Sequence, residues 1–148
     1  MSRAFVVDAS ATLKLLVEEP GTEDARRFFA RLADLEPPVL YVPDLLYVEC
    51  ANTLWKYVIR DQDTPGRAQA ALQALAELAL QAIPTQLLVQ PAFRLGTRYR
   101  ISVYDACYLA LAERLRCPLV TEDLDLIRRA RAHAAVPLYR LLDIGGGR

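Results

Sequence analysis

The segment SVYDACYLALAERLRCPLVTED, residues 102–123, decides the fold class of this chain. Residues 102–116 are predicted to form a helix, and Leu119-Val120 a short apolar strand directly after it. Asp105 lies at the start of that helix, three residues after Ser102, and Asp123 follows the strand. One short stretch therefore combines a helix, a strand and two acidic residues.

Short apolar runs alternate with helical patterns along the rest of the chain. Residues 4–7 are all apolar, which suits a strand covered on both faces. The alternation predicts an α/β fold with a small, mostly parallel sheet. The strands are expected at 4–7, 39–42, 83–87, 119–120 and 136–141. The helices are expected at 10–19 (capped by Ser10), 22–35, 44–60, 66–82, 102–116 and 123–134, with one more ending near residue 99.

The length of 148 residues is typical of one domain, which we expect to span 1–144, with the Gly-rich tail 145–148 frayed. Apolar residues make up 53% of the chain, so a disordered chain is excluded. The 18 basic and 18 acidic residues give zero net charge, which excludes a broad basic surface but leaves room for a local basic patch.

The rarer residue types exclude several classes of site. A single histidine, His133, rules out a metal site built from several histidines. The three cysteines, Cys50, Cys107 and Cys117, form no CxxC motif, which is typical of small buried thiols in a reducing compartment. No apolar run reaches the roughly 18–20 residues that a membrane helix needs. We therefore expect a cytoplasmic protein without a membrane anchor.

Four acidic residues occupy positions where chemistry is expected. Asp8 and Asp123 follow strands, and the carboxyl ends of strands are where sites form in open α/β sheets. Asp105 and Glu49 lie on predicted helices. Each also has a purely structural explanation. Asp105 lies at the spacing of a capping box with Ser102. Asp8 and Asp123 each precede a helix, where the helix dipole stabilises a negative charge. Glu49 begins a narrow polar stripe that could face either solvent or an acidic pocket.

Carboxylates gathered in one place have a restricted chemistry. Neighbouring negative charges raise one another's pKa, so an ionised cluster needs a cation. Hard oxygen ligands without histidine or thiolate select Mg²⁺ or Mn²⁺. Metal-assisted phosphodiester hydrolysis is the reaction that suits such a group, provided that the four acids converge.

The segments that carry these acids resemble the PIN-domain family and, within it, the VapC-type toxins of toxin–antitoxin pairs. The matching segments are Val6–Ala11, Pro43–Leu54, Ser102–Glu113 and Leu119–Asp123. The third of these together with the fourth is the most specific match, and the order of the segments agrees with the family over nearly the whole chain.

The resemblance implies a three-layer α/β/α sandwich and an Mg²⁺- or Mn²⁺-dependent endoribonuclease that leaves 5′-phosphate and 3′-hydroxyl ends. The zero net charge fits a nuclease that recognises a specific structured RNA, or one that is normally bound to a partner. The expected catalytic and metal-binding residues are Asp8, Glu49, Asp105 and Asp123. The residues expected to support them by hydrogen bonding or as an outer ligand are Ser10, Asn52, Thr121 and Asp125, while the role of Glu122 stays open.

A nuclease must also hold the charged backbone of its substrate. Candidate cations lie near the acidic segments: Lys14, Lys56, Arg98 and Arg100. Tyr99 and Tyr104 could stack on bases, although packing against the protein is the favoured interpretation for both. The resemblance further implies a homodimer and a cognate antitoxin. One face of the predicted helix 66–82 either joins the core or receives such a partner.

Three other functions remain open at this level. The first is a PIN ribonuclease in RNA processing without a toxin role. The second is a PIN-like binding module without catalysis, against which the four filled acidic positions argue. A phospho-acceptor or an Asp-x-Asp phosphatase is the weakest, because Ser10 stands where the phosphatase has its second aspartate.

Overall fold

A computed structural model describes residues 3–145 of the chain. Its five strands form one sheet in the order β3-β2-β1-β4-β5, and every neighbouring pair is parallel. The predicted parallel α/β sheet is confirmed, and it is parallel throughout. The strands are β1 (Ala4–Val7), β2 (Val39–Pro43), β3 (Leu80–Ile83), β4 (Leu119–Val120) and β5 (Leu138–Tyr139).

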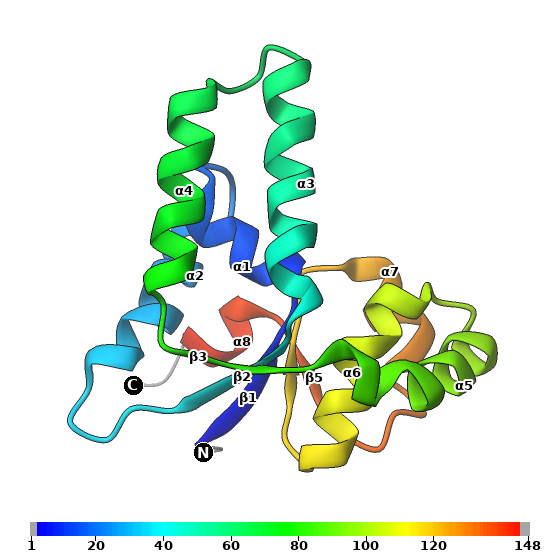
Figure 1. Cartoon of the computed structure of the whole chain (residues 1–148). Helices are drawn as coiled ribbons and strands as arrows, with labels where there is room; N and C mark the ends of the chain where they lie inside the picture. The colour runs from blue at the N-terminus through cyan, green and yellow to red at the C-terminus, as the bar shows by residue number, and fades with distance from the viewer. Residues whose placement is uncertain (1–2, 146–148) are drawn as a thin grey trace.

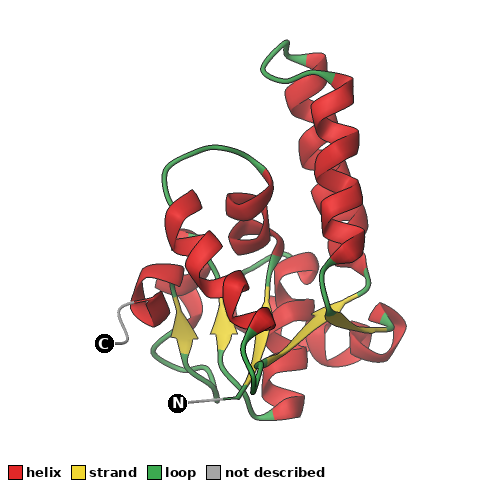
Figure 2. Cartoon of the chain, turned by 90° about the vertical axis from the view of Figure 1, so that its left-hand side faces the viewer, coloured by secondary structure: helices red, strands yellow, loops and turns green. Residues whose placement is uncertain are grey.

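Helices cover both faces of this sheet, which confirms the three-layer sandwich (Figure 2). Figure 1 shows α3 and α4 as a helical hairpin that projects beyond the edge where the strands end. The helices are α1 (Ala9–Leu16), α2 (Thr22–Ala30), α3 (Leu45–Ile59), α4 (Pro65–Glu77), α5 (Val89–Tyr99), α6 (Val103–Leu115), α7 (Leu124–Ala130) and α8 (Leu141–Gly145). Two 3₁₀ turns, Arg31–Ala33 and Thr85–Leu88, join them.

The core is built around α6 and β1. Residues 106–112 of α6 are buried without interruption, as expected for a helix surrounded by other elements. In β1, Val6 joins the larger cluster with α6, while Phe5 and Val7 join the smaller cluster on the other face. There the ring of Phe5 meets the ring of Phe28 from α2 edge-to-face, with centroids 5.5 Å apart. Alternate side chains of one strand thus fill two cores.

Two neighbouring predictions, the helix at 66–82 and the strand at 83–87, were wrong in their bounds. α4 ends at Glu77, and β3 occupies 80–83 because it pairs with β2 from Leu80 to Ile83. The Ala- and Leu-rich sequence favours a helix there, but tertiary pairing overrides local propensity. The apolar face of this segment is not a free surface over α4, since Leu75 is buried and Leu72 packs against the core.

Several termini also differ from the predictions. α2 ends at Ala30 instead of residue 35, α7 ends at Ala130 instead of 134, and β5 covers only 138–139. The short helix α8 was not predicted, because five residues carry too weak a periodicity. Gly145 ends this helix, so only residues 146–148 of the predicted frayed tail lie outside the described residues. In residues 3–145 no helix has the length and apolarity to cross a membrane.

The strand order creates one switch point. The chain proceeds from β1 outward through β2 to β3, and then returns to the other side of β1 with β4 and β5. Beside β1, the connections after neighbouring strands therefore diverge to opposite sides, and it is at such a switch point that open α/β sheets form a ligand-binding crevice. Asp8 follows β1 and Thr121 follows β4, so both residues stand at that crevice.

Candidate active site

Asp8 lies buried at the end of the central strand, with 4% of its surface exposed. Its Oδ1 accepts hydrogen bonds from Ser10 Oγ at 2.7 Å and from the backbone N–H of Ala11 at 3.0 Å. Its Oδ2 accepts a hydrogen bond from the hydroxyl of Thr121. Asp8 is therefore the N-cap of α1. The expectation that Ser10 caps this helix was wrong, because α1 begins at Ala9 and already contains Ser10.

Ser10 and Thr121 connect the ends of β1 and β4. Their hydroxyl oxygens are 3.2 Å apart, and both contact the Asp8 carboxylate. Ser10 Oγ also accepts the backbone N–H of Glu122 at 2.8 Å, and Thr121 Oγ1 accepts that of Asp123 at 3.0 Å. These two hydroxyls orient Asp8 and fix the loop that carries Asp123.

Glu49 reaches the same region from α3. Its Oε1 accepts a hydrogen bond from the hydroxyl of Tyr108 at 2.6 Å. Tyr108 lies on α6 and is 1% exposed, so it ties Glu49 to the buried helix. The sequence reasoning missed Tyr108. It lies three residues after Asp105 on one helix face, and this spacing is the feature that could have identified it.

Asp105 and Asp123 stand near the starts of two helices. Asp105 lies in the first turn of α6, where its backbone N–H donates to Ser102 Oγ at 3.1 Å. Asp123 is the N-cap of α7, and its Oδ1 accepts the N–H groups of Asp125 at 3.0 Å and Leu126 at 3.1 Å. The capping alternatives are therefore real for Ser102 and Asp123. A hydrogen bond with the Ser102 side chain also acts on the Asp105 carboxylate and lowers its pKa, whereas the Asp123 Oδ2 takes no part in the capping bonds.

Electrostatic interactions join the four acids into one group. Burial raises the pKa of Asp8 to about 7, although the hydrogen bonds from Thr121 and Ser10 favour its ionised form; the charge of Asp105 raises it further. Burial also raises the pKa of Glu49, with a contribution from Asp105. The pKa of Asp105 is raised by burial and then by the charge of Asp123. Asp105 is thus the common neighbour of the other three.

The chemistry of this group fits a hydrated divalent cation. The donors are carboxylate oxygens, and the salt bridges observed in residues 3–145 include none of these four acids. Within residues 3–145, no three Asp, Glu, His or Cys side chains are arranged so that together they could hold a metal ion directly. Mg²⁺ does not require three such ligands, because it keeps several waters and takes one or two carboxylates directly.

Two further acids near the site have other partners. Glu122 turns toward β5 and α8, where it accepts hydrogen bonds from Arg140 Nε and from the Leu141 backbone N–H, both at 2.9 Å. Asp125 is exposed and forms salt bridges with Arg128 and Arg129. Asp125 still lies close enough to raise the pKa of Asp105 slightly. Glu122 thus has a structural role, while Asp125 borders the group of acids.

The remaining expected residues lie on three different helices, α1, α3 and α5, or directly after them. Lys14 forms a salt bridge with Glu19 at 3.4 Å, and Asn52 and Lys56 are exposed on α3. Arg98 and Arg100 lie at the end of α5 and line a cavity with Tyr99, Arg129 and His133. Tyr99 is packed in the protein, with its hydroxyl donating to the carbonyl oxygen of His133 at 3.0 Å, whereas Tyr104 is 67% exposed.

The family model described as "PIN domain" matches residues 5–132. The chain belongs to the PIN-domain family. Among the curated members, the "Ribonuclease VapC3" of Pyrobaculum aerophilum is 35% identical over 127 residues, covering 84% of this chain and 93% of the relative. The "Ribonuclease VapC9" of Mycobacterium tuberculosis is 35% identical over 132 residues, covering 89% of this chain and 95% of the relative. The resemblance seen in the four segments is confirmed.

Solved structures of PIN-domain relatives share the fold. The structure of PAE2754 from Pyrobaculum aerophilum matches with a TM-score of 0.69 at 20% identity, covering 98% of this chain and 96% of that one. The structure of VapBC2 from Rickettsia felis, bound to a DNA fragment from the promoter, matches with a TM-score of 0.67 at 13% identity. That match covers 93% of this chain and 98% of the Rickettsia chain. At these identities the likeness establishes the fold.

The burial of Asp8 predicts how the stability of this PIN domain depends on pH without metal. The pKa is about 7 in the folded chain against an ordinary 3.8, so between these values the folded state holds a proton that the unfolded state has lost. Asp8 therefore lowers stability as pH rises through this range, by up to about 1.4 kcal/mol per pH unit. Asp8→Asn should remove this part of the slope, so that in EDTA at about pH 8 the variant is more stable than the wild type.

Urea unfolding at several pH values measures this difference. Asp34→Asn is the matched control, because Asp34 is exposed in a loop far from the acids along the chain. Equal pH slopes for the wild type and Asp8→Asn would contradict the effect assigned to burial.

Proposed function

We propose that this chain is a divalent-metal-dependent endoribonuclease of the VapC type, which cleaves a specific folded RNA as the toxin of a toxin–antitoxin pair. The observation that carries the proposal is the electrostatic interaction of Asp105 with Asp8, Glu49 and Asp123, beside the switch point of the sheet. The VapC ribonucleases that are 35% identical over most of their length support the same activity.

The proposed metal ligands are Asp8, Glu49, Asp105 and Asp123, taken directly or through water. Bound Mg²⁺ or Mn²⁺ would supply an acidified water as nucleophile and would neutralise charge on the phosphate. An all-oxygen donor set favours these hard ions. A pKa of about 7 for Asp8 also favours cation binding, because a nearby positive charge stabilises a carboxylate that burial disfavours.

The chain's own residues orient the reaction. Ser10 and Thr121 hold both oxygens of Asp8, and Tyr108 holds one oxygen of Glu49, so both carboxylates are held in fixed orientations. No side chain is needed as nucleophile, which agrees with the single histidine, His133, lying exposed beyond the end of α7. Cleavage in this scheme leaves a 5′-phosphate and a 3′-hydroxyl.

We further propose that the chain acts in the cytoplasm with a second copy of itself and with an antitoxin protein. The outer face of α3 offers apolar contact area, with Val48, Trp55 and Ile59 each more than half exposed. Two of the structural relatives are described as toxin–antitoxin systems, from Klebsiella pneumoniae and Mycobacterium tuberculosis. The three buried free cysteines suit a reducing compartment.

Cleavage of cellular RNA tests the proposed function. The purified, partner-free protein is incubated with total RNA and Mg²⁺ or Mn²⁺, and the cut ends are mapped by sequencing. We expect discrete cuts with 5′-phosphate ends that EDTA abolishes. Asp8→Asn and Asp105→Asn should each lower the rate by at least about a hundredfold, in the range seen when one charge-stabilising group is removed.

Asp34→Asn is the control and should cut at the wild-type rate. Cyclic 2′,3′-phosphate products, or cutting that persists in EDTA, would contradict the metal-dependent scheme. A folded wild type that cuts nothing with either metal would favour the binding-module alternative.

The Tyr108–Glu49 hydrogen bond predicts a second effect. Because this bond favours the ionised form of Glu49, Tyr108→Phe should raise the pKa of Glu49 further above its ordinary value. At neutral pH the variant should then need more Mn²⁺ for half-maximal cleavage, and higher pH should restore much of the loss. Metal titrations at two pH values measure this shift.

Tyr104→Phe is the matched control on the same helix, since Tyr104 is 67% exposed. A Tyr108→Phe variant with the wild-type metal requirement at both pH values would exclude a positioning role for this tyrosine.

A further inference from the structure

A cation-lined cavity of about 390 Å³ opens between the end of α5 and the end of α7. The residues that line it are Arg98, Tyr99, Arg100, Arg129 and His133. None of these five carries a carboxylate. On a chain with zero net charge, a cavity that gathers three guanidinium groups is a marked local excess of positive charge.

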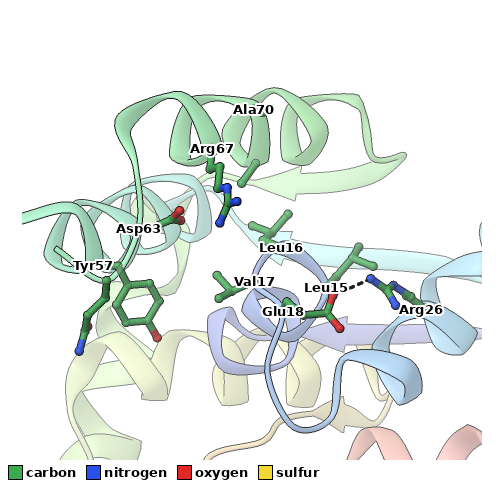
Figure 3. A pocket seen from close by; sticks show the side chains of 11 residues that line it. Leu15, Leu16, Val17, Glu18, Arg26, Tyr57, Asp63, Arg67 and Ala70 are labelled. Atoms are coloured by element: carbon green, nitrogen blue, oxygen red, sulfur yellow. Dashed lines mark hydrogen bonds and ion pairs between the residues drawn. The ribbon is translucent and has the colours of Figure 1, made fainter. Parts of the chain in front are cut away.

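A second cavity shows the contrast. It has about 510 Å³ and lies between the end of α1 and the α3–α4 hairpin (Figure 3). Its lining combines both signs of charge, and Glu18 forms a salt bridge of 2.8 Å with Arg26 (Figure 3). Charges that are already paired within the lining have little left to offer an anion. In the cavity at the end of α5, the salt bridges described for residues 3–145 involve only Arg129, whose partner Asp125 lies outside the lining.

Arg98 and Arg100 are available to a ligand. Both side chains are exposed, and neither takes part in the salt bridges observed in residues 3–145. The guanidinium carbon of Arg98 lies 5.3 Å from the centre of the Tyr99 ring. This ring is held in turn by the hydrogen bond from its hydroxyl to the carbonyl of His133. The ring of Tyr99 thus fixes the position of the Arg98 guanidinium, which has no acidic partner among the salt bridges of residues 3–145.

Arg100 occupies a backbone position that favours glycine. It caps α5 in the left-handed region with φ at 56°, and its N–H donates to the carbonyl oxygen of Gly96. Arg116 caps α6 in the same way, with φ at 53°. The two arginines have equal charge and equivalent backbone conformations, but only Arg100 lines the cavity. They form a natural pair of test and control.

The cavity adjoins the group of acids through two short connections. Arg129 Nε donates to Asp125 Oδ2 at 2.9 Å, and Asp125 lies near Asp105. Along the chain, Arg100 is followed closely by Ser102, whose Oγ accepts the backbone N–H of Asp105. These two connections place the cavity beside the acids, on the α6–α7 side.

We propose that this cavity binds a backbone phosphate of the RNA substrate, on the strand beside the bond that is cut, with Arg98 and Arg100 as its direct ligands. Guanidinium groups bind phosphate oxygens through paired hydrogen bonds. Arg129, which is paired with Asp125, borders the cavity on the α7 side. This inference rests on the proposed ribonuclease function and names where the substrate backbone is held.

RNA binding is measured in the Asp8→Asn background, which keeps the RNA intact. The probe is a mixed-sequence, fluorescein-labelled single-stranded RNA, titrated over a series of KCl concentrations without divalent metal. Arg98→Gln and Arg100→Gly should each weaken binding about tenfold or more, the loss expected for one charge-assisted contact. Each should also reduce the slope of log affinity against log salt by about 0.7.

The controls match each variant in charge and backbone. Arg116→Gly removes one positive charge and relieves the same left-handed strain as Arg100→Gly, so it should bind RNA as the parent does. Arg129→Gln is compared with Arg128→Gln, since both arginines form a salt bridge with Asp125 but only Arg129 lines the cavity. Thermal unfolding verifies that every variant is folded.

Two outcomes would overturn the proposal. One is unchanged affinity and salt slope in folded Arg98→Gln and Arg100→Gly. The other is a loss of affinity for polyglutamate, but not for RNA, in these variants, which would assign the cavity to an acidic protein segment.

RNA cleavage is assayed in parallel, with Asp8 intact. If both arginine variants cleave RNA and reach half-maximal rate at the same RNA concentration as the wild type, the proposed role of the cavity is rejected and the ribonuclease function stands. A wild type that never cleaves RNA would reject the proposed function itself.

Discussion

The hydrogen-bonded burial of one carboxylate at the end of the central strand is the constraint on which the site depends. Asp8 is enclosed by the start of α1 and by the loop after β4, and both of its oxygens are held by donors from those two segments. Burial disfavours its charge and raises its pKa to about 7, while three hydrogen bonds favour it. A buried carboxylate with a strongly raised pKa is typical of a site where a charged ligand binds and stabilises the ionised form.

The rest of the architecture brings other charges to this point. The strand order reverses beside β1, and α6 packs against the sheet there with its residues 106–112 buried. This helix carries Asp105, the common neighbour of the other acids, and one turn later Tyr108, which holds Glu49 of α3. A core helix and an active-site helix are thus the same element, so that packing of the core also sets the geometry of the carboxylates.

The sequence predicted the parallel sheet, its five strands and the position of each acid, because apolar runs and the residues after them are local features. It placed β3 too late, since pairing with β2 decides that boundary. It could not predict that Glu122 turns away to Arg140, nor that Tyr108 holds Glu49, because these are contacts between segments far apart in the chain. Arg98 and Arg100 were predicted as substrate-binding residues because they come shortly before Asp105 in the chain. The cavity that they line could not be predicted, because Arg129 of α7 also lines it and lies far from them in the sequence.

The proposed metal site consists of four carboxylates that bind one cation in the crevice between β1 and β4. An anomalous difference map of crystals soaked in Mn²⁺ would show whether this site exists. We expect a peak within about 2.0–2.2 Å of an Asp8 carboxylate oxygen, with Asp105 as a direct or water-mediated ligand, since Mn²⁺ accepts the same oxygen ligands as Mg²⁺. A map with no peak at the crevice, or with peaks only on exposed acids such as Asp125, would contradict it.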